Sequence, residues 1–195
     1  MLDRARLAFR EGAKTLAAFG DQCAPELCRL VEAVAQSLRA GGKVLVFGNG
    51  GSAADAQHLA AELVNRFRVD RPPLAGIALT TDTSALTAIG NDFGFERVFE
   101  KQVVALARPG DVVIGITTSG TSPNVVAGLR AARLRGCTCV GLTGEKGVSL
   151  GEACDFLFPV PSAETPRIQE CHVAWIHGFC DLLDATLFPE AGAAG

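Results

Sequence analysis

The chain has 195 residues, of which 48% are hydrophobic and 20% charged, and its net charge of -3 gives a pI near 5.6. This length and composition suit one globular domain with a buried core and exclude a disordered tail. No lysine or arginine cluster supplies the electrostatic footprint that nucleic acid or an anionic membrane needs. We therefore expect a single domain, residues 1–195, that binds neither directly.

The N-terminus and the cysteines predict a cytoplasmic protein. The start "MLDRARLAFREGAK" is charged throughout, and no apolar run approaches the roughly 20 residues that span a bilayer. Seven cysteines, an odd number without a C-x-x-C pair, lie mostly among apolar neighbours. We interpret them as reduced thiols of the core rather than as zinc ligands.

The predicted elements begin with two helices, over about residues 2–19 and 24–39, after which "AGGK" ends the second. Short apolar runs then alternate with helix-length segments: "KVLVFG", "LAGIALT", "DVVIGIT", "CTCVGLTG" and "DFLFPVP". This alternation is typical of a doubly wound, five-stranded parallel α/β sheet covered by helices on both faces. We place the helical segment at residues 1–40 and the α/β core at residues 41–190.

A last long helix is predicted from "SAETPRIQE" to about Leu187. Thr165 is placed to cap this helix, and Pro166 suits its first position because proline lacks the amide hydrogen that is unpaired there anyway. Ligands of doubly wound sheets bind at the carboxyl ends of the strands. The loops after the first and third strands are therefore the most informative.

The first of these loops, "GNGGSA", carries glycines that let the backbone approach an anion. Ser52 is expected to cap the following helix, so the loop favours a phosphate or sugar hydroxyls. The signal is weak alone, because Gly48, Gly50 and Ala53 also match the dinucleotide fingerprint G-x-G-x-x-A. A plain tight turn is a third interpretation.

The second loop, "TTSGTSPN", places several hydroxyls directly after the third strand. Ser122 is a predicted helix cap and Pro123 lies in the first helical turn. Hydroxyls and free amides around a helix start suit a phosphomonoester, whereas a dinucleotide has no need of them. An ordinary serine-rich capped turn remains the alternative.

Two pairs of polar residues lie on predicted helices. His58 and Glu62 are four apart and so share a face, as Gln169 and His177, eight apart, nearly do. An exposed, solvated pair is the commoner fate of such spacing, yet the four together have the donor types to hold zinc, although glutamine is an uncommon ligand. His172 falls on a different face and is interpreted as structural.

A third segment, "IGNDFGFE", is predicted to be a loop and turn before another helix. Asp92 either caps that helix or binds a substrate hydroxyl, and its composition favours capping.

Taken together, the segments "GNGGS", "QHLAAEL", "GNDFGF", "TTSGTSPNV" and "RIQECHVAWIH" resemble, in order, those of sugar-isomerase (SIS) domain proteins and, within them, the phosphoheptose isomerase family. The resemblance covers nearly the whole chain. It implies a homotetramer with active sites between subunits that converts D-sedoheptulose 7-phosphate to D-glycero-D-manno-heptose 7-phosphate for bacterial heptose and lipopolysaccharide synthesis. It also implies one zinc ion per subunit, bound by His58, Glu62, Gln169 and His177.

The same resemblance assigns the remaining roles. The expected substrate-binding residues, including Ser52 from the glycine loop, are Asn49, Gly50, Gly51, Ser52, His58, Glu62, Asn91, Asp92, Thr117, Thr118, Ser119, Ser122 and Gln169. Thr117 stands where the family often has serine, which keeps the hydroxyl. Glu62 and His177 correspond to the proton-transfer pair. Through an enediol, a proton then moves between C1 and C2, with a base beside carbon and an acid or cation at oxygen.

Two alternatives belong to other classes. The segments "LVNRF", "ALTTD" and "CDLLDATLFPE" also resemble a non-enzymatic SIS-domain adaptor that binds the replication initiator DnaA. That adaptor lacks equivalents of Glu62 and His177, so the enzyme is favoured. A dehydrogenase is disfavoured, because no ribose-binding acid follows about 20 residues after the glycines.

Overall fold

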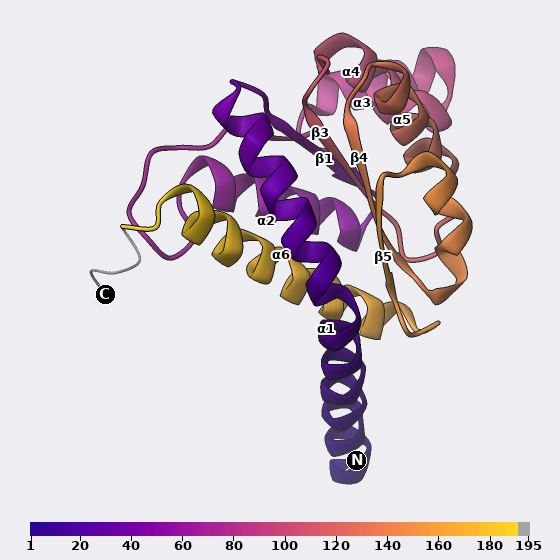
Figure 1. Cartoon of the computed structure of the whole chain (residues 1–195). Helices are drawn as coiled ribbons and strands as arrows, with labels where there is room; N and C mark the ends of the chain where they lie inside the picture. Colours follow the sequence, from indigo (N-terminus) through magenta and orange to yellow (C-terminus); the bar gives the residue numbers. More distant parts are fainter. Residues whose placement is uncertain (191–195) are drawn as a thin grey trace.

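The computed structural model describes residues 1–190 (Figure 1). Helix α1, Leu2–Arg39, runs unbroken, so the predicted division into two helices is wrong. The buried residues Phe19, Cys23, Leu27 and Leu30 form one continuous stripe across the expected break. Pro25 lies between them on the exposed side, so the hydrogen bond that proline cannot donate is lost where the helix backbone faces solvent.

Five parallel strands form one sheet, as predicted. They are β1 (Val44–Gly48), β2 (Gly76–Ala78), β3 (Val112–Ile116), β4 (Thr138–Gly144) and β5 (Phe156–Val160), in the order β2-β1-β3-β4-β5. All four pairings are parallel. Strands β1 and β3 are buried along their whole length, which explains their continuous apolar sequences.

Helices cover both faces of the sheet (Figure 1). One face carries α1, α2 (Gly51–Val64) and α6 (Thr165–Leu187), and the other carries α3 (Thr83–Phe93), α4 (Val98–Leu106) and α5 (Pro123–Leu134). Two 3-10 segments, η1 (Phe95–Arg97) and η2 (Glu145–Ala153), complete the fold. Strand β1 shows how the layers arise: Val44 and Val46 belong to one buried cluster, Leu45 and Phe47 to the other.

The strand order creates a switch point between β1 and β3, which are neighbours in the sheet. After β1 the chain enters α2 on one face, and after β3 it enters α5 on the other. The two helices therefore diverge, but Gly48 and Ile116, the last residues of β1 and β3, are register partners. The glycine loop and the hydroxyl loop thus begin side by side at the carboxyl edge, which is where such folds bind ligands.

The predicted helix caps differ in detail from the structure. Gly50 occupies the cap of α2 and Ser52 lies inside its first turn, while Glu164 rather than Thr165 precedes α6. Asp92 lies in the last turn of α3, so the predicted loop before a helix is wrong there. Asp82 caps α3 instead, accepting the Ala85 N–H at 2.9 Å.

The seven cysteines are free thiols, and all but Cys28 and the half-buried Cys154 are buried. Burial raises the pKa of Cys139 and of Cys180 to about 12, so both stay protonated. In residues 1–190 no helix combines the length and the apolar character that crossing a membrane requires.

Candidate active site

The glycine loop after β1 is closely packed against its neighbours. A Cβ on Gly48 would lie 2.7 Å from the Ile116 carbonyl oxygen, and Gly50 has a φ of +56°, so both positions favour glycine. A Cβ on Gly51 would lie 2.2 Å from Nε2 of Gln169 on α6. The structure thus brings two predicted site residues, Gly51 and Gln169, into direct contact.

The hydroxyl loop after β3 is organised around Thr117, which is 4% exposed. Its Oγ1 lies 3.0 Å from Ser122 Oγ and 3.4 Å from Ser119 Oγ, and it accepts the Gly120 N–H at 3.3 Å. Ser122 occupies the cap position of α5, but its hydroxyl pairs with Thr117 and caps no amide. Thr117 therefore builds the loop, whereas the exposed Ser119 remains available to a ligand.

A cavity of about 350 Å³ opens beside this loop. It is lined by Thr118, Ser119, Thr121, Lys146, Ser162, Ala163 and Thr165. Lys146 and Ser162, which follow β4 and β5, were not predicted from sequence, because no local pattern shows that these segments reach the hydroxyl loop. Hydroxyls around one cation form a polar environment that suits a phosphate.

The glycine and hydroxyl loops are joined by a pair of amides. Asn49 donates from Nδ2 to Oδ1 of Asn124 at 2.8 Å, and Asn124 donates back from Nδ2 at 2.9 Å. Asn124 is 2% exposed. Sequence analysis places it in the hydroxyl loop without giving it a role, and it fixes the distance between the two predicted halves of the site.

The two predicted histidines lie together, although one is on α2 and the other on α6. Nε2 of His58 and Nε2 of His177 are 2.9 Å apart, at hydrogen-bond distance. Nδ1 of His58 lies 3.6 Å from Oε1 of Glu62. The three side chains thus form a row, Glu62–His58–His177, in which the carboxylate and the second imidazole flank opposite nitrogens of the His58 ring.

The donor types of this row fit zinc, which binds imidazole nitrogen and carboxylate oxygen. Within residues 1–190, however, no three His, Cys, Asp or Glu side chains are arranged as a metal-binding group. Because Glu62 and His177 lie at opposite edges of the His58 ring, a shared ion requires a rearrangement of these side chains. Gln169 contacts Gly51 and lies about two helical turns before His177 on α6.

Two other residues support the row. The ring of Phe67 stacks on His177, with centroids 5.5 Å apart and an angle of 24° between the planes. Asp55, one turn before His58 on α2, is 9% exposed, and burial raises its pKa to about 6 against the opposing charge of His58. Sequence analysis identified neither residue, because an isolated aromatic or carboxylate carries no spacing signal.

The remaining predicted residues have mixed outcomes. Asn91 and Asp92 are exposed at the end of α3 and bonded to each other, Nδ2 to Oδ1 at 2.8 Å. In the part of the chain that the structure describes, no hydrogen bond joins them to the other site residues.

His172 is fully buried with Nε2 3.4 Å from the Thr143 carbonyl oxygen, and desolvation lowers its pKa to about 4. Its structural interpretation is confirmed.

Comparison with known proteins shows which family the chain belongs to. Residues 9–144 match the model of the SIS domain, so the chain belongs to the SIS-domain family. Within that family it is similar over nearly its full length to enzymes of one kind. A phosphoheptose isomerase of Aquifex aeolicus is 53% identical over 184 residues, covering 94% of this chain and 96% of the relative.

Further relatives are enzymes of the same kind. A phosphoheptose isomerase of Geotalea daltonii is 51% identical over 97% of this chain and 99% of its own. The solved structure of phosphoheptose isomerase GmhA from Neisseria gonorrhoeae has a TM-score of 0.89 and 44% identity, covering 94% of this chain and 98% of that one. These likenesses place the chain among the phosphoheptose isomerases, and they give the DnaA-binding adaptor no support.

Proposed function

We propose that this protein is an aldose–ketose isomerase that converts D-sedoheptulose 7-phosphate to D-glycero-D-manno-heptose 7-phosphate. The observation that carries the proposal is the row Glu62–His58–His177 on α2 and α6, in a molecule that also has a hydroxyl-rich loop at the carboxyl edge of the sheet. An isomerase of a sugar phosphate needs both features, an acid–base group for the carbons and an anion site for the phosphate. Full-length similarity to phosphoheptose isomerases supports the same reaction.

The phosphate end of the substrate binds the hydroxyl loop in this proposal. Ser119 is exposed and lines the cavity that also contains Lys146, whose ammonium group offsets the phosphate charge. Thr117 holds the loop from beneath, and the Asn49–Asn124 pair fixes the loop relative to the glycine turn. Binding energy from the phosphate then orients the reactive carbons at the other end.

The reactive end lies at α2 and α6. Glu62 removes the C1 proton of the ketose and delivers a proton to C2, while His177 holds or moves the proton at the O1 and O2 oxygens of the enediol. His58 lies between them, and its two nitrogens face both partners. Phe67 stacks on His177 and limits its ring orientations.

We also propose that the site binds zinc, because it contains the types of side chain that zinc prefers as ligands. His58 and His177, with Glu62 and Gln169, are the residues that would hold the ion. When bound, zinc would act as a Lewis acid on the substrate carbonyl. A carboxylate engaged by a metal is a weaker base, so Glu62 would serve one role at a time. Metal analysis of protein purified without added metal tests this, since about one zinc per chain is expected in the wild type and less in the variant His58→Ala.

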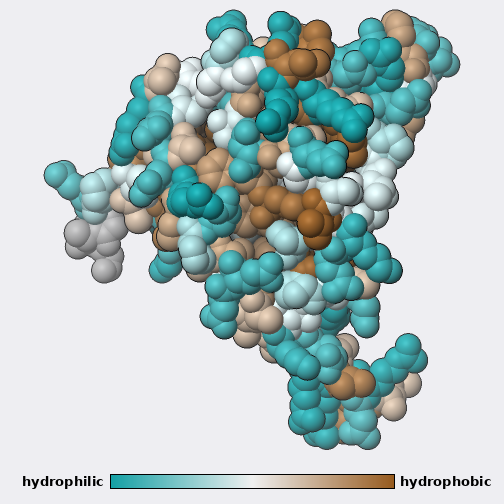
Figure 2. Space-filling view, turned by 45° about the vertical axis from the view of Figure 1, so that its right-hand side comes forward, coloured by the Kyte–Doolittle hydropathy of each residue, from teal (hydrophilic) through white to brown (hydrophobic). Residues whose placement is uncertain are grey.

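Assembly and location are further parts of the proposal. The N-terminal half of α1 projects beyond the body of the molecule, and Figure 2 shows its tip as mainly hydrophilic with isolated hydrophobic residues. Those exposed on this half are Leu2, Leu7, Phe9 and Leu16. These side chains support burial of this half of α1 against another subunit. We propose a homotetramer with active sites between subunits, in the cytoplasm of a bacterium that makes heptose for lipopolysaccharide or a related glycoconjugate. Light scattering of the purified protein measures the assembly.

The activity itself is tested by incubating purified protein with sedoheptulose 7-phosphate and following the product by NMR. Conversion that stops after chelation and returns with zinc is the expected result. Conversion that is indifferent to chelation would retain the isomerase and remove the metal. No conversion by folded, zinc-loaded protein would overturn the proposed function, and binding to DnaA would then be measured.

A further inference from the structure

The segment that follows α2 lies along α6 and contacts it once per turn. The Phe67 ring stacks on His177, Arg68 NH1 lies 3.1 Å from Oδ1 of Asp181, and Arg71 Nε donates to Oδ1 of Asp184 at 2.6 Å. These α6 residues are spaced by four and three, so they share one helical face. We call residues 67–71 the α6 strap.

Arg71 is the buried end of this strap. Its side chain is 1% exposed and that of Asp184 is 6% exposed, whereas those of Arg68 and Asp181 are 72% and 53% exposed. A buried ion pair is stable only when its remaining donors are also bonded. Arg71 meets this requirement through backbone carbonyls at the end of α2.

The carbonyls that Arg71 binds belong to the site. Its NH2 donates to the carbonyl oxygen of Glu62 at 2.8 Å, and its NH1 donates to that of Leu63 at 2.9 Å. The last carbonyls of a helix have no partner within the helix and carry partial negative charge, so a guanidinium is well suited to them. The same group is bonded to α6 through Asp184. One side chain therefore fixes the backbone of the proposed base to the helix that carries His177.

We propose that Arg71, held by Asp184, is a positioning residue that sets the location of Glu62 relative to His58 and His177. Without Arg71, the Glu62 carbonyl loses its partner, the Leu63 carbonyl keeps only the Leu74 N–H, and the helix end is released from α6. The carboxylate of Glu62 then departs from the substrate carbons, and proton transfer is sensitive to such displacement. Phosphate binding at the hydroxyl loop involves other elements and stays intact.

This inference rests on the proposed function, and the experiment separates the two. The single variant Arg71→Met leaves Asp184 as a buried carboxylate without its partner, so it is expected to fold poorly. The double variant Arg71→Met, Asp184→Leu removes both charges, which keeps the core apolar and the protein folded. The matched control is Arg68→Gln, which breaks the exposed ion pair of the same strap.

The readouts are kcat and KM for sedoheptulose 7-phosphate, with melting temperature and NMR of the histidine side chains. The double variant is expected to lose at least about tenfold in kcat, to keep KM within about twofold, and to melt near the wild type. The His58 and His177 signals shift while that of His172, buried against Thr143, does not. Arg68→Gln keeps kcat within about twofold.

Four outcomes decide the matter. A folded double variant with wild-type kcat would show that Arg71 serves stability alone and would overturn the inference. A rise in KM at constant kcat would place its effect on substrate binding and would overturn it as well. An inactive wild type would instead refute the proposed function, while unchanged His58 and His177 signals in the double variant would independently refute the positioning role.

Discussion

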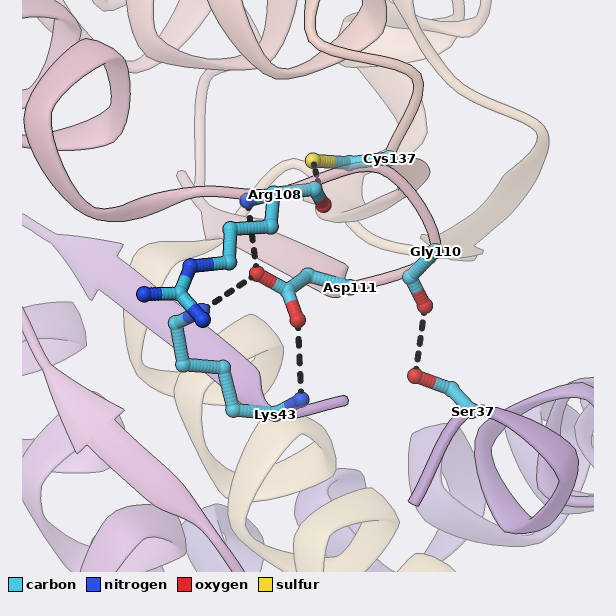
Figure 3. A network of polar contacts seen from close by, with 6 residues as sticks. All are labelled: Ser37, Lys43, Arg108, Gly110, Asp111 and Cys137. Carbon is cyan, nitrogen blue, oxygen red and sulfur yellow. Dashed lines mark hydrogen bonds and ion pairs between the residues drawn. The ribbon is translucent and has the colours of Figure 1, made fainter. Parts of the chain in front are cut away.

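The two edges of the sheet differ in how completely their polar groups are paired. At the amino edge, Asp111 is 2% exposed and accepts the backbone N–H of Lys43 at 3.0 Å, the Lys43 ammonium at 2.6 Å and the Arg108 N–H at 2.8 Å (Figure 3). Ser37 on α1 donates to the Gly110 carbonyl at 2.6 Å in the same network. The polar groups of this network are therefore hydrogen-bonded to one another.

The carboxyl edge keeps donors and acceptors accessible. Ser119 is exposed at this edge, and the exposed His177 on α6 and the side chain of Glu62 on α2, which is 21% exposed, lie on the helices that run back from it. A ligand can therefore bind at the carboxyl edge and along these two helices, whereas the polar groups of the amino-edge network already have partners. The difference teaches that this fold buries its stabilising polar network and leaves its reactive groups accessible.

The largest expected effect is at the accessible row Glu62–His58–His177. Changing Glu62 to glutamine keeps the shape of the side chain but removes the base, and we expect kcat to fall about 10³-fold, within the range typical of general bases. Turnover by NMR measures this, with unchanged circular dichroism showing an intact fold. The exposed Glu152→Gln should keep full activity as a matched control, and full activity of Glu62→Gln would remove Glu62 as the base.

The next effect is a loss of stability at the amino edge, where the paired network around Asp111 is broken. Asp111→Ala leaves the backbone amides of Lys43 and Arg108 without their acceptor, so we expect the free energy of unfolding to fall by about 2–4 kcal/mol. Urea denaturation measures the loss, and kcat of the folded variant should stay within about twofold of the wild type. A loss no greater than that of Arg68→Gln, which breaks an exposed pair, would contradict the role given to this network.

A smaller effect concerns pH and the buried His172 between the two edges. Its folded-state pKa, about 4, lies below the ordinary 6.5, so the unfolded chain binds a proton first as pH falls. This group therefore removes stability on acidification from about 6.5 toward 4, and we expect about 2 kcal/mol between pH 7 and pH 5. Asp55, with its pKa raised to about 6, acts in the opposite sense over the lower part of this range.

The variant His172→Gln isolates the histidine, since Asp55 is common to both proteins. Denaturation at pH 7 and pH 5 should show a smaller loss of stability in the variant than in the wild type. An equal loss in the two proteins would mean that His172 does not titrate as its burial requires.

The smallest effect is at the phosphate end of the carboxyl edge. Ser119→Ala removes one hydroxyl from a charged ligand, and we expect KM to rise about tenfold with kcat nearly unchanged. Ser84→Ala, an exposed serine on α3, is the matched control. An unaltered KM in Ser119→Ala would argue against a phosphate at this loop.

The same comparison shows what sequence can predict. Alternating strands and helices define the sheet, and its topology alone brings the loops after β1 and β3 together. A site that groups His58 and Glu62 with Gln169 and His177 also follows from polar positions on otherwise apolar helices, whereas the direct contact between the two histidines does not. These features depend on periodicity and strand order, which a single sequence records well.

Features that depend on packing between distant segments were missed or misplaced. The continuity of α1 past Pro25 depends on which side of the helix meets the body, and the position of Asp92 depends on where α3 ends. The contacts Asn49–Asn124 and Phe67–His177 join elements far apart in the chain. No local pattern encodes such contacts, so the orientation of the site emerges only from the fold.

The most direct test of the account is conversion of sedoheptulose 7-phosphate by the purified, zinc-loaded protein in D₂O, followed by NMR. We expect the aldose product with solvent deuterium at C2, as protonation of an enediol by Glu62 requires, and no such product from Glu62→Gln. Absence of conversion by the folded wild-type protein would contradict the assignment of isomerase chemistry to the row Glu62–His58–His177.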